Sequence, residues 1–556
     1  MPGDPGSATS RGWLWIFLLA LAVRLLFVFV AANNGTDAVS RLDYASQWLQ
    51  HPARLPDASA KDAWLPLHFW LLGAFLWFWR SELGARLFTV LFGALTILPY
   101  WGTVRRAFNR RVALASTFLF ALFGFHVAYS VTTSVEAPTV FFLVSGVYCW
   151  VRFYLEARWK WCIFAAVAIS AACLCRFDPW VTIPVLAVLL LDFSRGGASV
   201  WSDRRVWWRM VCFSLAASAG AVGWMTFSYV RWGDPMELPH RTMRLIQSSL
   251  PVLRHSLPFR LAVVPLSLLT SLSPLIIVLA VVGVLWVLRQ GEPVTRRIAV
   301  LALVLFATNY FNAAKNETTQ ARYTLVYSWS LIPFAFEGLR RLARQWPWSD
   351  SRNAYAVTIV FFLLWQAGII IGGRYAPATV ADRLGPMSPT LLPHVEIRQL
   401  SRWLRDHASN SGALVFDDFN FEAGGIIQFA AIDPSRVFQV RAPADSDRGL
   451  LSQEVQSFMR SRHPRFVICS PYGPIGTMWS LDDHENLELP AAGLSMSLQW
   501  RGPHWRVYQI NYPPDGGAEE THPVRVAHRP VSTPFVARRM ASISAPRSLP
   551  SVPTFR

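Results

Sequence analysis

Long apolar runs that are almost free of charge constrain the fold of this chain more than any other feature. Between Trp13 and Ala31, for example, Arg24 is the only charged residue. About 20 consecutive apolar residues cross the hydrocarbon core of a bilayer as a helix. Such runs recur as far as about residue 375, and charged residues make up only 15% of the chain, against about 25% in soluble domains. We therefore predict an α-helical polytopic membrane protein, which excludes a soluble globular enzyme.

Eleven apolar runs are separated by charged residues, and we expect each to form one transmembrane helix. They cover residues 12–32, 84–104, 112–128, 135–152, 160–176, 179–193, 207–229, 262–288, 297–312, 322–338 and 354–373. The first run lacks a convincing small-residue cleavage site, so we expect it to be retained as a span. A twelfth apolar segment, Trp64 to Trp79, is short for a crossing and carries Pro66 and His68 near its start.

The distribution of positive charge predicts the orientation in the membrane. Lys and Arg number 52 against 34 Asp and Glu. The arginine-rich loops are those near 105–111, 152–160, 195–209, 289–297 and 340–344. They alternate with loops poor in positive charge, and the positive-inside rule assigns them to the cytoplasm. All five share one side only if Trp64 to Trp79 stays at the interface, so we expect residues 1–11 inside and large outside loops at about 32–85 and 231–259. Membrane topology thus explains the basic balance, and no nucleic acid is needed as a partner.

The composition changes after about Pro389. Helix-like stretches (HVEIRQLSRWLRDH, SQEVQSFMRSR) alternate there with short β-rich runs (GALVFDD, RFVICS, HWRVYQI). This pattern predicts a small extracytoplasmic α/β domain over residues 389–512, whose sheet order the sequence does not determine. Residues 513–556 are rich in proline and arginine and poor in large apolar residues, which predicts a disordered tail.

The first outside loop contains the best candidate for a catalytic base. Asp37 follows the first span by a few residues, and Asp43 lies six residues further on. A carboxylate at a membrane boundary can accept a proton from a hydroxyl nucleophile. Alternatively, Asp37 or its neighbour Thr36 caps the helix-like stretch that follows.

Further charged residues lie where apolar runs end on the predicted outside. Glu136 borders a span, and an acid in that position is a functional candidate, although it would also complement the dipole of the helix it begins. Arg176 and Asp178 lie in a tight turn, where they could simply pair with each other. Lys315 and Arg322 lie at the mouth of two spans, where a guanidinium can clamp a phosphate or extend to the interface.

Taken in order, several stretches of this chain resemble the GT-C superfamily of polyprenyl-phosphate-dependent glycosyltransferases. The superfamily includes protein O-mannosyltransferases, lipid A aminoarabinose transferases and rhizobial lipopolysaccharide galacturonosyltransferases. The matching stretches are GTDAVSRLDYASQWLQHP, WLPLHFWLLG, ARLFTVLFGALTILPYWGTVRRAFNRR, HVAYSVTTSVEAP, CRFDPWVTIP and QARYTLVYSWSLIP. The resemblance spans roughly residues 12–512. It implies a GT-C transmembrane domain over about residues 12–375, with about eleven transmembrane helices, followed by the extracytoplasmic α/β domain.

The resemblance also implies a set of site residues. The acid of the first outside loop falls on Asp37, the acid after the third span on Glu136, and the arginine of the RY motif on Arg322, which Tyr323 follows. The chain departs from the commonest pattern because Ala38 replaces the second acid of an adjacent pair. The remaining predicted substrate-binding residues are Asp43, His68, Arg176 and Lys315. We predict no certain cofactor, and a divalent metal between Asp37 and Glu136 stays open.

The implied activity is transfer of a sugar from a polyprenyl-phosphate donor to a hydroxyl group of a glycolipid, glycan or protein, with inversion at the anomeric carbon. The reaction would take place on the outer face of a bacterial plasma (inner) membrane. A secondary transporter or lipid flippase is the alternative, with Arg24 and Glu136 lining a pathway. The absence of a visible internal repeat, the acid-rich first loop and the α/β domain favour the transferase.

Overall fold

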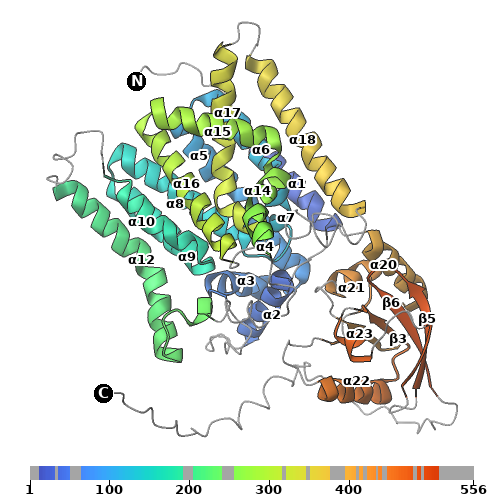
Figure 1. Cartoon of the computed structure of the whole chain (residues 1–556). Helices are drawn as coiled ribbons and strands as arrows, with labels where there is room; N and C mark the ends of the chain where they lie inside the picture. The colour runs from blue at the N-terminus through green and yellow to red at the C-terminus, as the bar shows by residue number, and fades with distance from the viewer. Residues whose placement is uncertain are drawn as a thin grey trace, which may run out of the picture.

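The computed structural model of the chain consists of a large helical bundle and a small α/β domain (Figure 1). It describes residues 12–31, 36–50, 64–191, 204–240, 256–315, 321–345, 351–375, 395–408 and, with short gaps, 412–512. The predicted N-terminal segment 1–11, the tail 513–556 and most of the loop 231–259 lie outside these residues.

The bundle is built from apolar helices. Their bounds are α1 (Gly12–Val30), α4 (Glu82–Leu95), α5 (Ile97–Ala107), α6 (Arg110–Ala121), α7 (Gly124–Ser130), α8 (Glu136–Glu156), α9 (Trp159–Cys175), η2 (Asp178–Val181), α10 (Thr182–Val188), α12 (Arg204–Trp232), α14 (Leu257–Leu272), α15 (Pro274–Gln290), α16 (Pro293–Ala314), η5 (Ala321–Thr324), α17 (Leu325–Gln345) and α18 (Ser351–Tyr375). Within the described residues, six spans are long and apolar enough to cross a membrane, and up to eight if two bent helix pairs each count as one span. The predicted class of polytopic helical membrane protein is confirmed, whereas the number of eleven spans is not established.

The run over residues 262–288 does not form one continuous helix, as a simple span would. Two helices, α14 and α15, meet there at an angle of 106°. Ser273 has a φ of 79°, in the left-handed region that L residues rarely adopt, and Pro274 lacks the N–H that a continuous helix needs. The Ser273 hydroxyl instead accepts a bond of 3.4 Å from the backbone N–H of Ile276 and so begins α15. The run 112–128 is also bent, by 50° between α6 and α7.

Two helices between α1 and α4, α2 (Thr36–Gln50) and α3 (Leu67–Phe78), lie together at one end of the bundle (Figure 1). Arg86, near the start of α4, donates bonds to the carbonyl of Ala31 just after α1 (2.9 Å) and to that of Val131 just after α7 (2.7 Å). The chain therefore leaves α1 and enters α4 at the same end. The 12 residues of α3 span about 18 Å, well short of a bilayer core of about 30 Å. The arginine-rich loops can all lie on one side of the membrane only if the chain follows such a path between α1 and α4.

Buried arginines in the bundle bind the carboxyl ends of neighbouring helices. Arg24 is fully buried and donates to the carbonyl of Ala121, the last residue of α6, at 3.0 Å. Arg297 donates to the carbonyl of Leu189, just after α10, at 2.8 Å, and Arg86 acts in the same way. The last carbonyls of a helix lack intrahelical partners and carry partial negative charge. These contacts stabilise positive charge inside the protein, and Arg24 faces protein rather than lipid.

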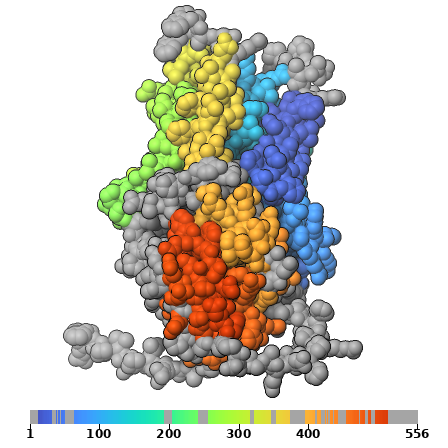
Figure 2. Space-filling model, turned by 90° about the vertical axis from the view of Figure 1, so that its right-hand side faces the viewer, coloured from blue at the N-terminus to red at the C-terminus, as the bar shows by residue number. Residues whose placement is uncertain are grey.

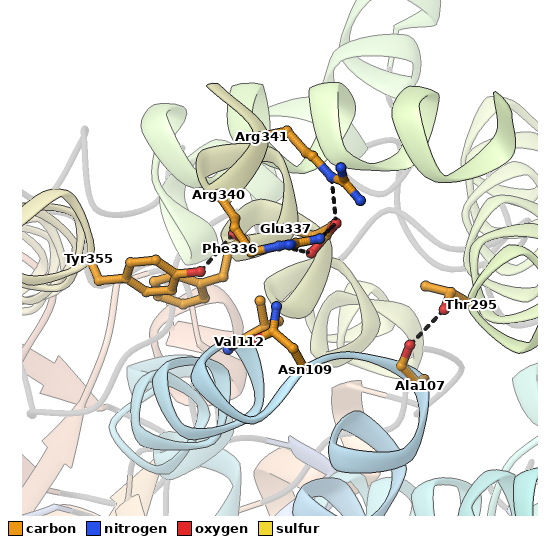
Figure 3. Close-up of polar contacts among 9 residues, drawn as sticks. All are labelled: Ala107, Asn109, Val112, Thr295, Phe336, Glu337, Arg340, Arg341 and Tyr355. Carbon is orange, nitrogen blue, oxygen red and sulfur yellow. Dashed lines mark hydrogen bonds and ion pairs between the residues drawn. The ribbon is translucent and has the colours of Figure 1, made fainter. Parts of the chain in front are cut away.

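The opposite end of the bundle carries the arginines that were assigned to the cytoplasm, and it holds a buried acid. Glu337 on α17 is 4% exposed. It accepts bonds from Arg340 (2.8 Å) and Arg341 (3.0 Å), which lie one helical turn further along α17 (Figure 3). Nearby, the side chain of Asn109 accepts a bond from the backbone N–H of Val112 and caps α6. Paired charges and caps thus complete the helix ends on this side.

The α/β domain contains one six-stranded sheet. Its strands are β1 (Leu414–Asp417), β2 (Val437–Val440), β3 (Phe466–Cys469), β4 (Asn486–Leu489), β5 (Leu494–Arg501) and β6 (Arg506–Asn511), in the order β2-β1-β3-β6-β5-β4. Strands β2, β1 and β3 are parallel, and the other neighbours are antiparallel. The helices are α20 (Val395–Ala408), α21 (Ala423–Ala430), α22 (Arg448–Arg462) and α23 (Pro474–Trp479). The predicted α/β character is confirmed.

Alternating residues of the central strands divide the core of this domain into two clusters. Leu414 and Phe416 pack in one with α20 and α21, and Val415 packs in the other with α22. Both faces are therefore covered, as expected for strands that are apolar throughout.

The α/β domain contacts the bundle at the end where α1 terminates. Arg398 on α20 donates a bond of 2.8 Å to the carbonyl of Val30, the last residue of α1. Two residues earlier, Glu396 accepts bonds from the backbone N–H groups of His504 (2.8 Å) and Trp505 (2.9 Å) and so joins α20 to the sheet. Figure 2 shows the domain below α1 and α18. It lies at the same end of the bundle as α2 and α3 (Figure 1).

Candidate functional site

A buried network of charged side chains surrounds Glu136, the first residue of α8. The carboxylate is 2% exposed, and its Oε1 accepts a bond of 2.7 Å from the guanidinium of Arg176. The same oxygen lies 3.8 Å from the guanidinium of Arg322. Arg176 also donates a bond of 2.7 Å to Asp178. Three segments far apart in the sequence thus meet at one carboxylate, and we call Glu136, Arg176, Asp178 and Arg322 the Glu136 cluster.

Helix ends bring the cluster together. Arg176 follows the last residue of α9, Asp178 begins the short helix η2, and Arg322 lies in η5, just before α17. Apolar residues fill the helices, so charged residues occur where these helices end at one face of the bundle. The expected pair of Arg176 and Asp178 is present, but Arg176 also binds Glu136, which the sequence did not indicate.

Tyr323 contacts both arginines of the cluster. The Cζ atom of Arg176 lies 4.7 Å from the centre of the tyrosine ring, and that of Arg322 lies 5.5 Å from it. A guanidinium is attracted to the face of an aromatic ring. The ring therefore helps to keep two like charges close to each other. Two neighbouring guanidinium groups form a concentration of positive charge with forked N–H donors, which suits a phosphate group.

His68 on α3 is fully buried, and neither of its ring nitrogens has a hydrogen-bond partner among the described residues. Burial and the nearby guanidinium of Arg41 lower the pKa of His68 well below its usual value, so its imidazole is neutral. A neutral imidazole offers one donor and one acceptor. Leaving such groups buried and unpaired costs about 1–3 kcal/mol, which is typical of a site that a ligand completes.

Glu136 also has an unsatisfied acceptor. Its Oε2 atom is buried and has no hydrogen-bond partner within the part of the chain that the structure describes. The sugar and acceptor hydroxyl groups of a carbohydrate substrate are donors of the kind that this oxygen and His68 could bind.

Arg41 is a member of the site that our sequence analysis missed. It is 3% exposed, its guanidinium lies 4.6 Å from the centre of the Trp64 ring, and its charge acts on both His68 and Cys175, the residue before Arg176. Arg41 therefore lies between α3 and the end of α9. Its spacing of four residues from Asp37 would have indicated a shared helix face.

Asp37 and Asp43 both lie in α2, and their side chains are outside the described residues. The helix begins at Thr36, so Asp37 lies within its first turn, where the helix dipole favours a carboxylate. The hydroxyl of Thr133 donates a bond of 2.5 Å to the carbonyl of Ala38, the next residue. The start of α2 therefore contacts the segment that leads into Glu136.

Lys315 is not joined to the Glu136 cluster. It follows the end of α16, its side chain is exposed, and its Nζ atom lies 4.3 Å from the centre of the Phe311 ring. No contact between Lys315 and the cluster is found in the described ranges. As for a metal, those ranges contain no group of three or more His, Cys, Asp or Glu side chains that could hold an ion.

Comparisons with known proteins show the fold of the chain. Residues 57–224 match the model of the dolichyl-phosphate-mannose-protein mannosyltransferase family. Crystal structures of ArnT from Cupriavidus metallidurans are similar over nearly the whole chain. In the apo state the identity is 14%, with 90% of this chain and 98% of ArnT covered and a TM-score of 0.57. The chain has the GT-C fold.

A second structure of ArnT, bound to undecaprenyl phosphate, shares the GT-C fold at 15% identity, with 91% of this chain and 99% of ArnT covered and a TM-score of 0.54. The oligosaccharyltransferase of Archaeoglobus fulgidus, in complex with Zn and sulfate, matches at 13% identity, with 83% of this chain and 68% of that chain covered and a TM-score of 0.49. A search of curated protein sequences finds no match. The predicted resemblance to the GT-C superfamily is confirmed.

Proposed function

We propose that this protein is a membrane glycosyltransferase that moves a sugar from a polyprenyl-phosphate donor to a hydroxyl group of an acceptor. The observation that carries the proposal is the pair of guanidinium groups, Arg176 and Arg322, beside the buried carboxylate of Glu136 and the ring of Tyr323. The GT-C fold and the match to a mannosyltransferase family model support it.

The arginines of the cluster act on the phosphate that leaves. When the bond between the anomeric carbon and the phosphate oxygen breaks, the phosphodiester becomes a phosphate monoester and gains one negative charge. Guanidinium groups that are already in place stabilise this charge more in the transition state than in the ground state. Arg176 is held by two carboxylates at 2.7 Å each, whereas Arg322 lies 3.8 Å from Glu136. The side chain of Arg322 is also more exposed than that of Arg176, at 17% against 9%, and we assign the phosphate to Arg322 and a supporting role to Arg176.

Asp37 acts as the base. It accepts the proton of the acceptor hydroxyl, whose oxygen attacks the anomeric carbon from the side opposite the phosphate. A single displacement of this kind inverts the anomeric configuration. The position of Ala38 against the segment before Glu136 supports a location of Asp37 beside the cluster. The imidazole of His68 and the Oε2 atom of Glu136 bind hydroxyl groups of the sugar or the acceptor.

The donor is lipid-linked, and the reaction takes place at the end of the bundle that holds the cluster. One of the two similar ArnT structures is bound to undecaprenyl phosphate, which supports a polyprenyl carrier. The positive-inside count supports the non-cytoplasmic side for this end. We propose that the membrane is a bacterial plasma membrane. A glycan, a lipid and a protein are all acceptors compatible with these observations.

The transporter alternative relied on Arg24 and Glu136 as lining of a pathway. Arg24 instead donates to the carbonyl of Ala121 and contacts the ring of His126 at 2.8 Å. Glu136 lies at the start of its helix and pairs with Arg176. The partners of both residues therefore explain their burial without a transport pathway.

The proposal is tested by mass spectrometry of cell-envelope glycans from cells that contain the wild-type protein or the Arg322→Ala variant. We expect one glycan, glycolipid or glycoprotein to lose one sugar mass in the variant, with the donor lipid accumulating. Identical glycan profiles in the wild type, the variant and a strain without the gene would overturn the proposed function.

A further inference from the structure

Two polar contacts join the segment before Glu136 to both sides of the chain that carries Asp37. Arg86 donates to the carbonyl of Ala31, at the end of α1, and to the carbonyl of Val131. Two residues after Val131, the hydroxyl of Thr133 donates to the carbonyl of Ala38 in the first turn of α2. Residues 131–133 are therefore linked to the chain both before and after Asp37.

Both donors are shielded from water. Arg86 is 1% exposed and Thr133 is fully buried. If either hydrogen bond were removed, water could not readily replace it, and a buried carbonyl would lose a partner. The Thr133 bond thus constrains the start of α2 more strongly than a surface bond would, and Arg86 ties the end of α1, which precedes α2, to Val131.

The same segment leads directly into the Glu136 cluster. Thr133 precedes Glu136 by three residues, and Glu136 is the first residue of α8. Any displacement of α2 relative to this segment changes the distance between Asp37 and the guanidinium groups bound at Glu136. We propose that Thr133 and Arg86 are positioning residues, which hold the helix of Asp37 in register with the Glu136 cluster so that the base acts on the acceptor while the phosphate site holds the donor of the same reaction. This inference rests on the proposed function.

Catalysis by a positioned base depends steeply on such a register. The base must reach the hydroxyl proton while the phosphate stays on its arginines, and a shift of about 1 Å can cost up to about a hundredfold in rate. Donor binding depends on the arginines of the Glu136 cluster, whereas the Thr133 bond holds the start of α2. Loss of the Thr133 bond should therefore act on turnover rather than on donor affinity.

The test compares Thr133→Val, which has nearly the same shape without the hydroxyl, with Thr133→Ser, which keeps it. Thr132→Val is a matched control, because the hydroxyl of Thr132 bonds to Ser134 within the same segment, at 2.9 Å. We expect Thr133→Val to lower kcat about tenfold with the KM for the donor changed less than twofold. Thr133→Ser and Thr132→Val should keep kcat within about threefold of the wild type.

Hydrogen–deuterium exchange of the purified proteins gives a readout that does not depend on activity. We expect faster exchange of the amides of α2 in Thr133→Val than in the wild type or Thr132→Val. Wild-type kcat and wild-type exchange in Thr133→Val would overturn the inference, and so would equal losses in Thr133→Val and Thr132→Val. A wild-type protein that transfers no sugar would overturn the proposed function, whereas the exchange data would still decide whether Thr133 holds α2.

Discussion

Arg176 and Glu136 form an ion pair of 2.7 Å in which the side chains are only 9% and 2% exposed, and Arg176 reaches Asp178 at the same distance. The pair connects the end of α9 with the start of α8, 40 residues apart in the sequence. A buried pair of this kind is strongly destabilising to break, because the remaining charge loses its partner.

The first prediction concerns the stability that depends on this pair. Glu136→Ala should lower the free energy of unfolding by about 1.5–3 kcal/mol, because it removes a charge-assisted hydrogen bond from the guanidinium of Arg176, which keeps Asp178 as a partner. Thermal unfolding in detergent measures the change. The control is Glu156→Ala, which breaks a more exposed pair with Arg152, whose side chains are 21% and 27% exposed, and should change the melting temperature much less. Equal melting temperatures of the two variants would contradict the prediction.

The second prediction concerns the base. Asp37→Asn should lower turnover by about 10²- to 10⁴-fold and leave the protein folded, because an amide of the same shape cannot accept the proton of the acceptor. Asparagine also begins helices well, so α2 should form as before. Turnover is measured with a lipid-linked donor, and folding by size-exclusion chromatography. Near-normal turnover would transfer the assignment to Asp43.

The third prediction concerns the phosphate site. Arg322→Lys should weaken donor use because lysine keeps the charge but loses the planar fork that binds two phosphate oxygens. Donor affinity and turnover of the purified variant are the measurement. Lys315→Gln is the matched control, since Lys315 is exposed and lies against Phe311, and it should behave like the wild type. If the Lys315 variant lost donor affinity and the Arg322 variant did not, the phosphate would bind elsewhere.

The fourth prediction concerns the path of the chain between α1 and α4. Single cysteines at Asp57 and Ser81 should react with a membrane-impermeant maleimide from the same, outer side, because Arg86 bonds to the carbonyl of Ala31 at one end of the bundle. A cysteine at Arg344, on the predicted cytoplasmic side, should react with the same maleimide only after the membrane is permeabilised. Labelling of positions 57 and 81 from opposite sides would contradict the topology.

The fifth prediction concerns Cys469 in the α/β domain. Burial raises the pKa of the Cys469 thiol well above its usual value, and the nearby carboxylate of Asp417 raises it further. Because the thiolate is the reactive form, alkylation at pH 8 should be slow in the folded protein and fast after denaturation. Mass spectrometry of the domain's peptides measures it. Rapid alkylation of the native protein would show that β3 is accessible.

The membrane-protein class, most of the apolar helices and the α/β domain follow from local sequence properties. Hydropathy over about 20 residues is sufficient to predict a span, and short β-rich runs are sufficient to predict β1, β3 and β6. The signal for the break between α14 and α15 was also local, because Pro274 interrupts the run, although we read the run as one span. The motifs around Asp37, Glu136 and Arg322 were similarly visible as charged residues at the ends of apolar runs.

Only the tertiary structure decided which of these residues meet. The distances from Glu136 to Arg176 and Arg322 depend on how several helices pack, and no local pattern encodes that packing. The same is true of Arg86 and Thr133, whose partners are backbone carbonyls that every residue possesses. The sheet order was likewise undetermined by the sequence, because strands of four residues can pair in many ways. Sequence thus determined which segments are apolar or charged, and long-range packing determined which charges share a site.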